Sequence, residues 1–425
     1  MASSSFVGDT DGAPSIDRTK NSSGRIWIHR PYQLTPSAQT APSAESVITK
    51  QCPLPKATPN SSPEEKLHRI VSSSSTPEKT IEQIYQSKVE FYELQLQSRV
   101  TKEAQSRIQR CTIQSPNGLG EVDATIYLPQ VDDDDTTQRD DGTPLRLRGI
   151  CLHVHGGGWL WGDSYYQVAH RCLEMANSIN AAVVSVEYSL FCQPNRHYDC
   201  NDEPNNDPKK FDPVNDVSIA IDWIESNGAK ELNACPSFVA SGESSGAHLL
   251  LLAMLNRRNK EEQSSTTQSA TLFTSTWKCL NFVYGVFDIS GTPSIRTDGD
   301  SSAPICGNDL LWMFEMYYSR VQKPMKVLDD GVAQPMPMDR QHPSLSPLYA
   351  NLSNMPPALI SVGTADPLID DSLFMANKYS AYGNHVELAI YEGGEHGIGH
   401  FGGQEEEEMG MQARRNTLEF MKGYL

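Results

Sequence analysis

From residue 111 onward, short runs of β-type residues alternate with helical stretches, and this alternation limits the possible folds more than any other feature of the chain. Such an alternation is typical of a mostly parallel sheet that carries helices on both faces. We therefore predict an α/β fold with a central sheet. The segments expected to form its strands are 122–128, 147–154, 181–187, 236–241, 280–286, 358–363 and 385–391.

The chain before this alternation is expected to form two regions. Residues 1–62 are rich in Ser, Thr, Pro and Gln and have few large apolar side chains, so they bury too little surface to offset the entropy of ordering. We predict a disordered tail there; a targeting peptide is the alternative, although its aspartates argue against it. Residues 63–110 form an N-terminal helical region, with a helix over 77–108 that begins at a proline after a hydroxyl cap.

The formal net charge of −18 and the pI of about 5.0 argue against surfaces that attract nucleic acid or anionic lipid headgroups. No apolar run approaches the roughly 20 residues that span a bilayer, and the N-terminus lacks the features of a secretory signal, so we expect a soluble protein without stable membrane insertion. The nine cysteines are scattered and odd in number, which favours reduced thiols and a cytoplasmic location. A disulfide between Cys192 and Cys200 is an alternative.

Two further alternatives concern bound groups. The acidic stretch over 131–144 suits a solvated loop between strands, and its spacing is not that of an EF-hand calcium loop. The sequence contains neither HExxH nor a zinc-type cysteine spacing, which argues against a metal-dependent enzyme. We expect no metal and no cofactor.

A GxSxG motif joins a strand-like run to an apolar helical stretch at Ser244. Glycines at 242 and 246 relieve crowding around a sharp turn, so that the serine hydroxyl stands clear of the sheet at a helix N-terminus. The motif alone occurs often by chance, but the order of strand, turn and helix is the context that it needs. Ser244 is therefore a candidate nucleophile.

A second motif, HGGGW, follows the strand expected at 147–154. Successive glycines leave backbone NH groups unshielded, so Gly156 and Gly157, together with the NH of Ser245, are candidates for an oxyanion hole. A flexible glycine turn and a phosphate-binding loop are the alternatives. No GK[ST] follows the glycines, which argues against the phosphate loop.

Asp366 and His396 each lie just after an expected strand near the C-terminus. The carboxyl ends of strands are where sites of doubly wound sheets assemble, and the chain order Ser, Asp, His is that of one known class of hydrolase. His400 is the rival for the base. Asp370 and Asp371 are the rivals for the acid.

The motifs HGGGW, GESSG, DPLIDD and EHG, in this order, resemble those of the hormone-sensitive-lipase-type esterases of the α/β-hydrolase superfamily. The resemblance covers roughly residues 111–425 and is especially close from His342 to Ser372. It implies an α/β-hydrolase fold with a helical cap formed by about 292–342 and the N-terminal helical region. It also implies a catalytic triad and an oxyanion hole, consisting of Ser244, Asp366 and His396 and of Gly156, Gly157 and Ser245.

The chain departs from the family pattern in three places. The family commonly has GDSAG where this chain has GESSG, and Gly-Phe after the histidine where this chain has Gly397-Ile398. Neither change removes a catalytic atom. An insertion rich in Asn, Asp and Cys also follows Leu190 and continues to about residue 211, which leaves the shape of the pocket open.

The expected activity is hydrolysis of small to medium acyl esters through an acyl-enzyme. Trp159 and Trp161 are the candidate substrate-binding residues, whereas His155 and His248 are expected to have structural hydrogen bonds. An amidase or deacetylase with the same triad is one alternative, and a non-catalytic binding protein on the same fold is another. The oligomeric state is left open.

Overall fold

The computed structural model is built around one large sheet with the strand order β1-β11-β10-β7-β6-β4-β5-β3-β2. The strand β3 pairs antiparallel with β2 and β5, and the remaining pairs are parallel. The sheet is therefore mostly parallel, as predicted. The structure describes residues 25–29, 99–130, 146–191, 211–264, 270–298, 305–321, 325–327, 333–335, 338–398 and 404–425.

The strands of this sheet are short, and four of them, β4, β5, β6 and β10, are buried along their whole length. Their bounds are β1 Arg25–His29, β2 Ile108–Gln114, β3 Glu121–Tyr127, β4 Ile150–Val154, β5 Ala182–Val186, β6 Phe238–Glu243, β7 Trp277–Val283, β10 Ala358–Gly363 and β11 Val386–Tyr391. The helices are α3 Lys102–Gln105, α4 Ala169–Ile179, α5 Pro213–Trp223, η3 Ile224–Gly228, α6 Ala229–Glu231, α7 Ser245–Ser264, α8 Ala270–Thr276, α9 Pro293–Asp298, α10 Gly307–Arg320, η4 Pro347–Tyr349, α11 Ile369–Ala381 and α12 Gln404–Lys422.

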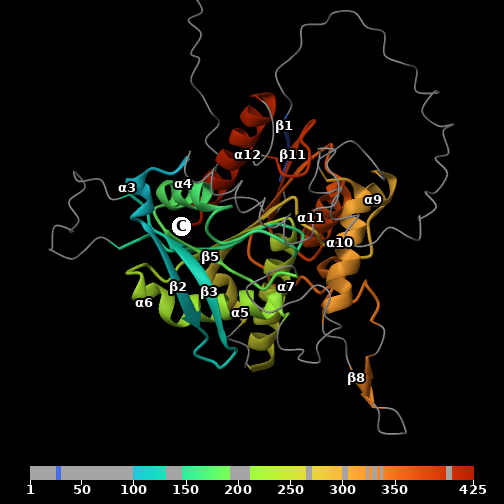
Figure 1. Ribbon diagram of the computed structural model, residues 1–425, viewed down its shortest axis with the longest axis horizontal. Coiled ribbons are helices and arrows are strands. Elements are labelled where there is room, and N and C mark those ends of the chain that lie inside the picture. The colour runs from blue at the N-terminus through green and yellow to red at the C-terminus, as the bar shows by residue number, and fades with distance from the viewer. Residues whose placement is uncertain are drawn as a thin grey trace, which may run out of the picture.

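Helices cover both faces of the sheet (Figure 1). Because side chains alternate along a strand, Val183 of β5 packs in the core on the α4 and α12 side, while Val184 packs in the core on the α5 and α7 side. Leu359 and Ile360 of β10 divide in the same way. The two apolar clusters sandwich the sheet, so its strand ends are held at fixed positions for a site.

The predicted strands agree with the structure in order and approximate place. The largest displacement is that of 280–286, where the strand is Trp277–Val283. Two strands of this large sheet, β1 and β2, were not predicted. The strand β1 lies within the predicted tail of residues 1–62 and pairs in parallel with β11; the rest of that range lies outside the described residues.

The prediction of a helix over 77–108 is wrong at its C-terminal end. The structure instead has the short helix α3, with Thr101 as its N-cap, and the strand β2 begins at Ile108. The Thr101 hydroxyl accepts a bond from the Ala104 NH at 3.1 Å, and cap residues of this kind start a helix rather than continue one. The part of the predicted helix before residue 99 lies outside the described residues.

The segment predicted to form a cap, residues 292–342, contains α9, α10 and the small antiparallel pair of β8 Met325–Val327 and β9 Ala333–Pro335. The inner side of α10 is buried against the main core through Trp312, Phe314 and Tyr317. In the described ranges, no helix combines the length and apolar character that crossing a membrane requires.

Candidate active site

Ser244 lies in a sharp turn between β6 and α7, with a left-handed φ of 52°. A Cβ at Gly242 would lie 2.8 Å from the Ala247 Cα, and a Cβ at Gly246 would lie 2.2 Å from the Val154 carbonyl oxygen. Both positions therefore require glycine, because any side chain there would push the helix away from the sheet. The strained turn is the one that the GxSxG motif predicts.

The structure brings Ser244, His396 and Asp366 together, although they are far apart in the sequence. The Ser244 Oγ is 3.0 Å from the His396 Nε2, and the His396 Nδ1 is 3.0 and 3.1 Å from the two carboxylate oxygens of Asp366. The three residues are 7%, 6% and 2% exposed. Asp366 also accepts a bond from the Leu368 NH at 2.8 Å, which fixes its carboxylate beside the imidazole.

The rival acids have other partners. Asp370 accepts a bond from the Ser294 NH at 2.8 Å. Asp371 is buried and accepts bonds from the Phe287 and Asp288 NH groups and from the Thr292 hydroxyl. These bonds hold the root of the cap segment, at the start of α9. The rival base, His400, lies outside the described residues.

The loop after β4 packs directly against the nucleophile turn. A Cβ at Gly156 would lie 3.0 Å from the Glu243 carbonyl oxygen and 3.3 Å from the Ser244 Cβ. Gly157, Gly158 and Trp159 then have consecutive positive φ angles of 132°, 62° and 62°. Such a run turns the backbone sharply beside Ser244, which is the arrangement expected of an oxyanion loop.

Ser245 is the first residue of α7. The NH groups of the first helical turn have no carbonyl of a preceding turn to bond, and they lie at the positive end of the helix dipole. The Ser245 NH therefore lies beside Ser244, the candidate nucleophile, in a position that suits the stabilisation of a developing negative charge. The structure thus brings all six predicted catalytic and oxyanion residues into one place.

Comparison with known proteins adds to this geometry. The family model described as alpha/beta hydrolase fold matches residues 151–400, more than half of the chain. The chain belongs to this family. Carboxylesterase NlhH of Mycobacterium tuberculosis is 28% identical over 287 residues, which cover 67% of this chain and 72% of that protein. Carboxylic ester hydrolase LipN of the same organism is 26% identical over 289 residues, which cover 67% and 62%.

Solved structures support the fold of this hydrolase. The monoclinic form of the Pyrobaculum calidifontis esterase superposes with a TM-score of 0.60 at 22% identity, covering 84% of this chain and 97% of that one. The resemblance to hormone-sensitive-lipase-type esterases is confirmed, and so are the α/β-hydrolase fold and the carboxylesterase-type class of enzyme.

Trp159 lies under the cap segment of this hydrolase and is only 1% exposed. Its ring stacks on Tyr317 of α10 at 4.5 Å and meets His248 of α7 edge to face at 5.2 Å. This aromatic cluster joins the glycine loop, α7 and α10. Trp161 is partly buried nearby. Contact of either tryptophan with a substrate stays a prediction.

The structural hydrogen bonds predicted for His155 and His248 are present. The His155 Nδ1 is 2.9 Å from the Gly156 carbonyl oxygen, and the His248 Nε2 is 2.7 Å from the Leu345 carbonyl oxygen. Burial lowers the pKa of each imidazole to about 4, since a charged ring loses its hydration there. Both rings are therefore neutral at pH 7.

A neutral buried histidine makes the stability of the fold depend on pH. The unfolded chain takes up a proton at His248 below about pH 6.5, whereas the folded chain does so only near pH 4, so the free energy of unfolding falls as the pH drops through this window. We expect His248→Gln, whose amide can still donate to Leu345, to reduce the loss between pH 7 and pH 5 by about 2 kcal/mol. Urea titrations of the wild type and the variant at pH 7 and pH 5 measure the free energy of unfolding. If it falls as much in the variant as in the wild type, the prediction is wrong.

One neighbour of the candidate base was not predicted from the sequence. The Tyr284 ring packs edge to face against the His396 ring at 4.9 Å, and Tyr284 has a left-handed φ of 39°. Its NH donates to the Ser361 carbonyl oxygen at 2.6 Å. A tyrosine directly after the strand β7 was the available signal, but nothing in the sequence placed it beside His396.

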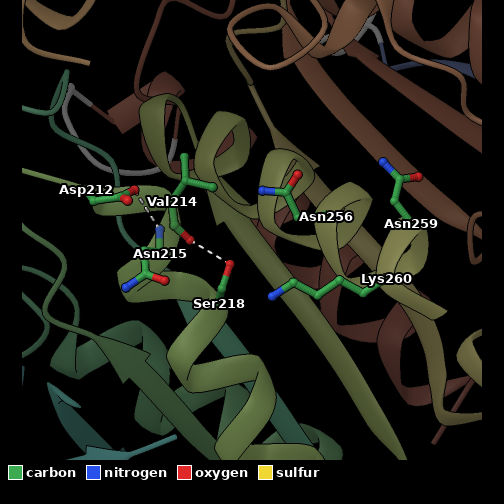
Figure 2. Close-up of a pocket in the computed structure, with 7 residues that line it drawn as sticks. All are labelled: Asp212, Val214, Asn215, Ser218, Asn256, Asn259 and Lys260. Carbon is green, nitrogen blue, oxygen red and sulfur yellow. Dashed lines mark hydrogen bonds between the residues drawn. The ribbon is translucent and has the colours of Figure 1, made fainter. Parts of the chain in front are cut away.

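A polar pocket of about 370 Å³ lies away from these residues, between the start of α5 and the end of α7 (Figure 2). Asn256 is twelve residues beyond Ser244, which is about 18 Å along the helix, so this pocket is remote from the nucleophile. Its polar lining consists of amides, one ammonium, one carboxylate and the Ser218 hydroxyl, which donates to the Val214 carbonyl oxygen at 2.8 Å rather than to a base. The residues that line it are Asp212, Val214, Asn215, Ser218, Asn256, Asn259 and Lys260.

Within the described part of the chain, no group of three or more His, Cys, Asp or Glu side chains could hold a metal ion. The acidic stretch over 131–144 and the cysteines Cys192 and Cys200 lie outside that part.

Proposed function

We propose that this hydrolase cleaves carboxylic esters of small to medium acyl chain length, with Ser244 as nucleophile, His396 as base and Asp366 as the orienting acid. The observation that carries the proposal is the 3.0 Å approach of the Ser244 Oγ to the His396 Nε2, with Asp366 on the other ring nitrogen. A nucleophile, a base and a third group that orients the base are the parts that acyl transfer needs.

The chemical steps follow from these contacts. The carboxylate of Asp366 accepts a bond from the His396 Nδ1–H, so that the Nε2 is unprotonated and takes the Ser244 proton as the Oγ attacks the ester carbonyl. The Gly156, Gly157 and Ser245 amides would stabilise the oxyanion of the tetrahedral intermediate. The imidazolium returns the proton to the leaving alkoxide. Water, deprotonated by the same imidazole, then hydrolyses the acyl-enzyme and regenerates Ser244.

We expect the site to favour an apolar acyl group. The aromatic rings of Trp159, Phe314 and Tyr317 pack together between the glycine loop and the cap. Walls of this kind favour apolar chains over charged ones. Trp161 is partly buried, its Cδ1 would lie 3.2 Å from a Cβ at Gly157 of the glycine loop, and we propose it as a substrate contact together with Trp159. A cytoplasmic location is also proposed, on the scattered and odd set of cysteines.

The test is hydrolysis of p-nitrophenyl acetate, butyrate and decanoate beside the matching p-nitroanilides. We expect turnover of the esters, with acetate or butyrate preferred to decanoate and little turnover of the anilides. Comparable rates for anilides would favour an amidase with the same triad. A folded protein that binds these esters without turnover would contradict the proposal and favour a binding protein.

A further inference from the structure

A row of polar side chains crosses the central strands on the face that α4 and α12 cover. His153 of β4 is in register with Ser185 of β5 and Ser241 of β6, and Ser241 is in register with Asn281 of β7. All four residues are at most 2% exposed. The His153 Nδ1 is 3.1 Å from the Ser185 Oγ, and the Asn281 amide donates to the Ser241 Oγ at 2.9 Å. Buried polar groups are costly unless they are paired in this way.

The side chain of Glu243 points to this same face of the sheet, because Glu243 follows Ser241 by two residues on β6. It forms an ion pair with the Arg171 guanidinium of α4 at 3.0 Å and lies 3.5 Å from the His153 Nε2. Burial alone lowers the pKa of His153, but Cys172 and Glu243 outweigh it and raise the value to about 10. The Glu243 carboxylate thus lies between the Arg171 guanidinium and the His153 imidazole, and it favours the protonated form of that ring.

These contacts join the two parts of the candidate active site. Glu243 is the last residue of β6 and immediately precedes Ser244, and its carbonyl oxygen is the atom that a Cβ at Gly156 would meet. His153 is on β4, whose end leads into the glycine loop. The contact of His153 with Glu243 thus ties the strand before the nucleophile to the strand before the oxyanion loop.

We propose that Glu243 is a positioning residue: the ion pairs of its carboxylate fix the distance between the end of β6, which carries the nucleophile, and the loop after β4, which carries the candidate oxyanion donors. The inference rests on the proposed function. A displacement of about 1 Å at such a site costs roughly 100-fold in rate, so a clamp behind the nucleophile affects turnover without touching the substrate.

The same face offers a matched control. A small pocket of about 50 Å³ opens between α4 and α12, and both Glu243 and Arg171 line it. Arg414 of α12 lines it too and forms an ion pair with Glu174 of α4 at 3.3 Å. That pair joins the two helices, whereas the Glu243 pair reaches the strands beneath the active site. Arg414→Gln therefore removes a more exposed ion pair at the same pocket, without touching the strands.

The experiment measures kcat and KM for p-nitrophenyl butyrate. We expect Glu243→Gln to lower kcat roughly 10- to 100-fold with KM changed less than twofold, and Glu243→Asp, which keeps the charge, to recover part of the loss. Arg414→Gln should retain the wild-type kcat. Because Arg171 acts through Glu243, the double variant Glu243→Gln, Arg171→Met should lose no more than the more impaired single variant.

Three results would overturn the inference: a wild-type kcat in Glu243→Gln, equal losses in Glu243→Gln and Arg414→Gln, or a rise in KM at constant kcat. If Glu243→Gln does not fold, kcat is compared between Glu243→Asp and Arg414→Gln. A lower kcat in Glu243→Asp supports the inference, and equal values overturn it. The rate at which a fluorophosphonate labels Ser244 should show the same ratios of variant to wild type, and it requires no ester turnover. A wild type that is labelled but hydrolyses no ester refutes the proposed function and leaves this comparison valid.

Discussion

Replacing Ser244 with alanine is expected to lower kcat for p-nitrophenyl butyrate by roughly 10⁴-fold or more, with little change in KM. The substitution removes the only atom that would form the acyl bond, while the glycine loop and the aromatic cluster remain. The substitution removes one atom, the Oγ that contacts His396 at 3.0 Å, and keeps the Cβ in the turn, so the fold should stay intact. Steady-state kinetics of the purified variant, with a circular dichroism melt, measure both effects.

The matched control for this variant is Ser218→Ala. Ser218 lies on α5, remote from His396, and its hydroxyl bonds the Val214 carbonyl oxygen at 2.8 Å. The Ser218→Ala variant should keep the wild-type kcat for p-nitrophenyl butyrate. A Ser244→Ala protein that retains even a tenth of the wild-type kcat would show that another residue is the nucleophile.

Asp366→Asn is expected to lower kcat by about 10⁴-fold. The carboxylate accepts from the His396 Nδ1, which keeps the proton on that nitrogen and leaves the Nε2 free to accept from Ser244. An amide can instead donate to the Nδ1, and the ring then carries its proton on the wrong nitrogen. The variant should fold normally, because the side chain keeps its shape. A kcat profile over pH, measured beside the wild type, tests the loss.

Asp370→Asn serves as the control, since this rival carboxylate bonds the Ser294 NH at the root of the cap rather than the imidazole. We expect its kcat to stay within a few-fold of the wild type. If Asp370→Asn were the more damaging of the two substitutions, the assignment of the acid to Asp366 would be wrong.

The positions of the candidate triad follow from local sequence signals. The GxSxG turn requires glycines where the helix approaches the sheet, and the approach at Gly246 is 2.2 Å for an added Cβ. Asp366 and His396 each follow a mostly apolar, strand-like run, and adjacent parallel strands end at the same edge of a sheet. Adjacency of β10 and β11 therefore brings the acid and the base together without any long-range inference.

Other parts of the fold carry weaker signals. The strand β2, IQRCTIQ, is an edge strand with mostly polar or half-exposed positions, so its pattern does not separate it from the end of a helix. The strand β1 pairs with β11, which lies near the other end of the chain, and a local sequence pattern does not predict such a long-range pairing. The burial of Trp159 depends on α10 folding over it, which no spacing in the glycine motif indicates.

The ion pairs of Glu243 show the same limit. GESSG identifies Glu243 only as a departure from the common GDSAG, and nothing in the motif names its partners. His153 and Arg171 become its neighbours through the register of β4 with β6 and through the packing of α4 on the sheet. Contacts of this kind need the tertiary structure.

The central claim is that Ser244 is an activated nucleophile, and covalent trapping tests it most directly. The protein is treated with an organophosphate that bears a p-nitrophenyl leaving group, and the modified peptide is identified by mass spectrometry. We predict one phosphoryl group per chain, carried by Ser244, with one equivalent of p-nitrophenol released and strongly slowed labelling in His396→Ala. A folded protein that is not labelled, or is labelled at another residue, would contradict the claim.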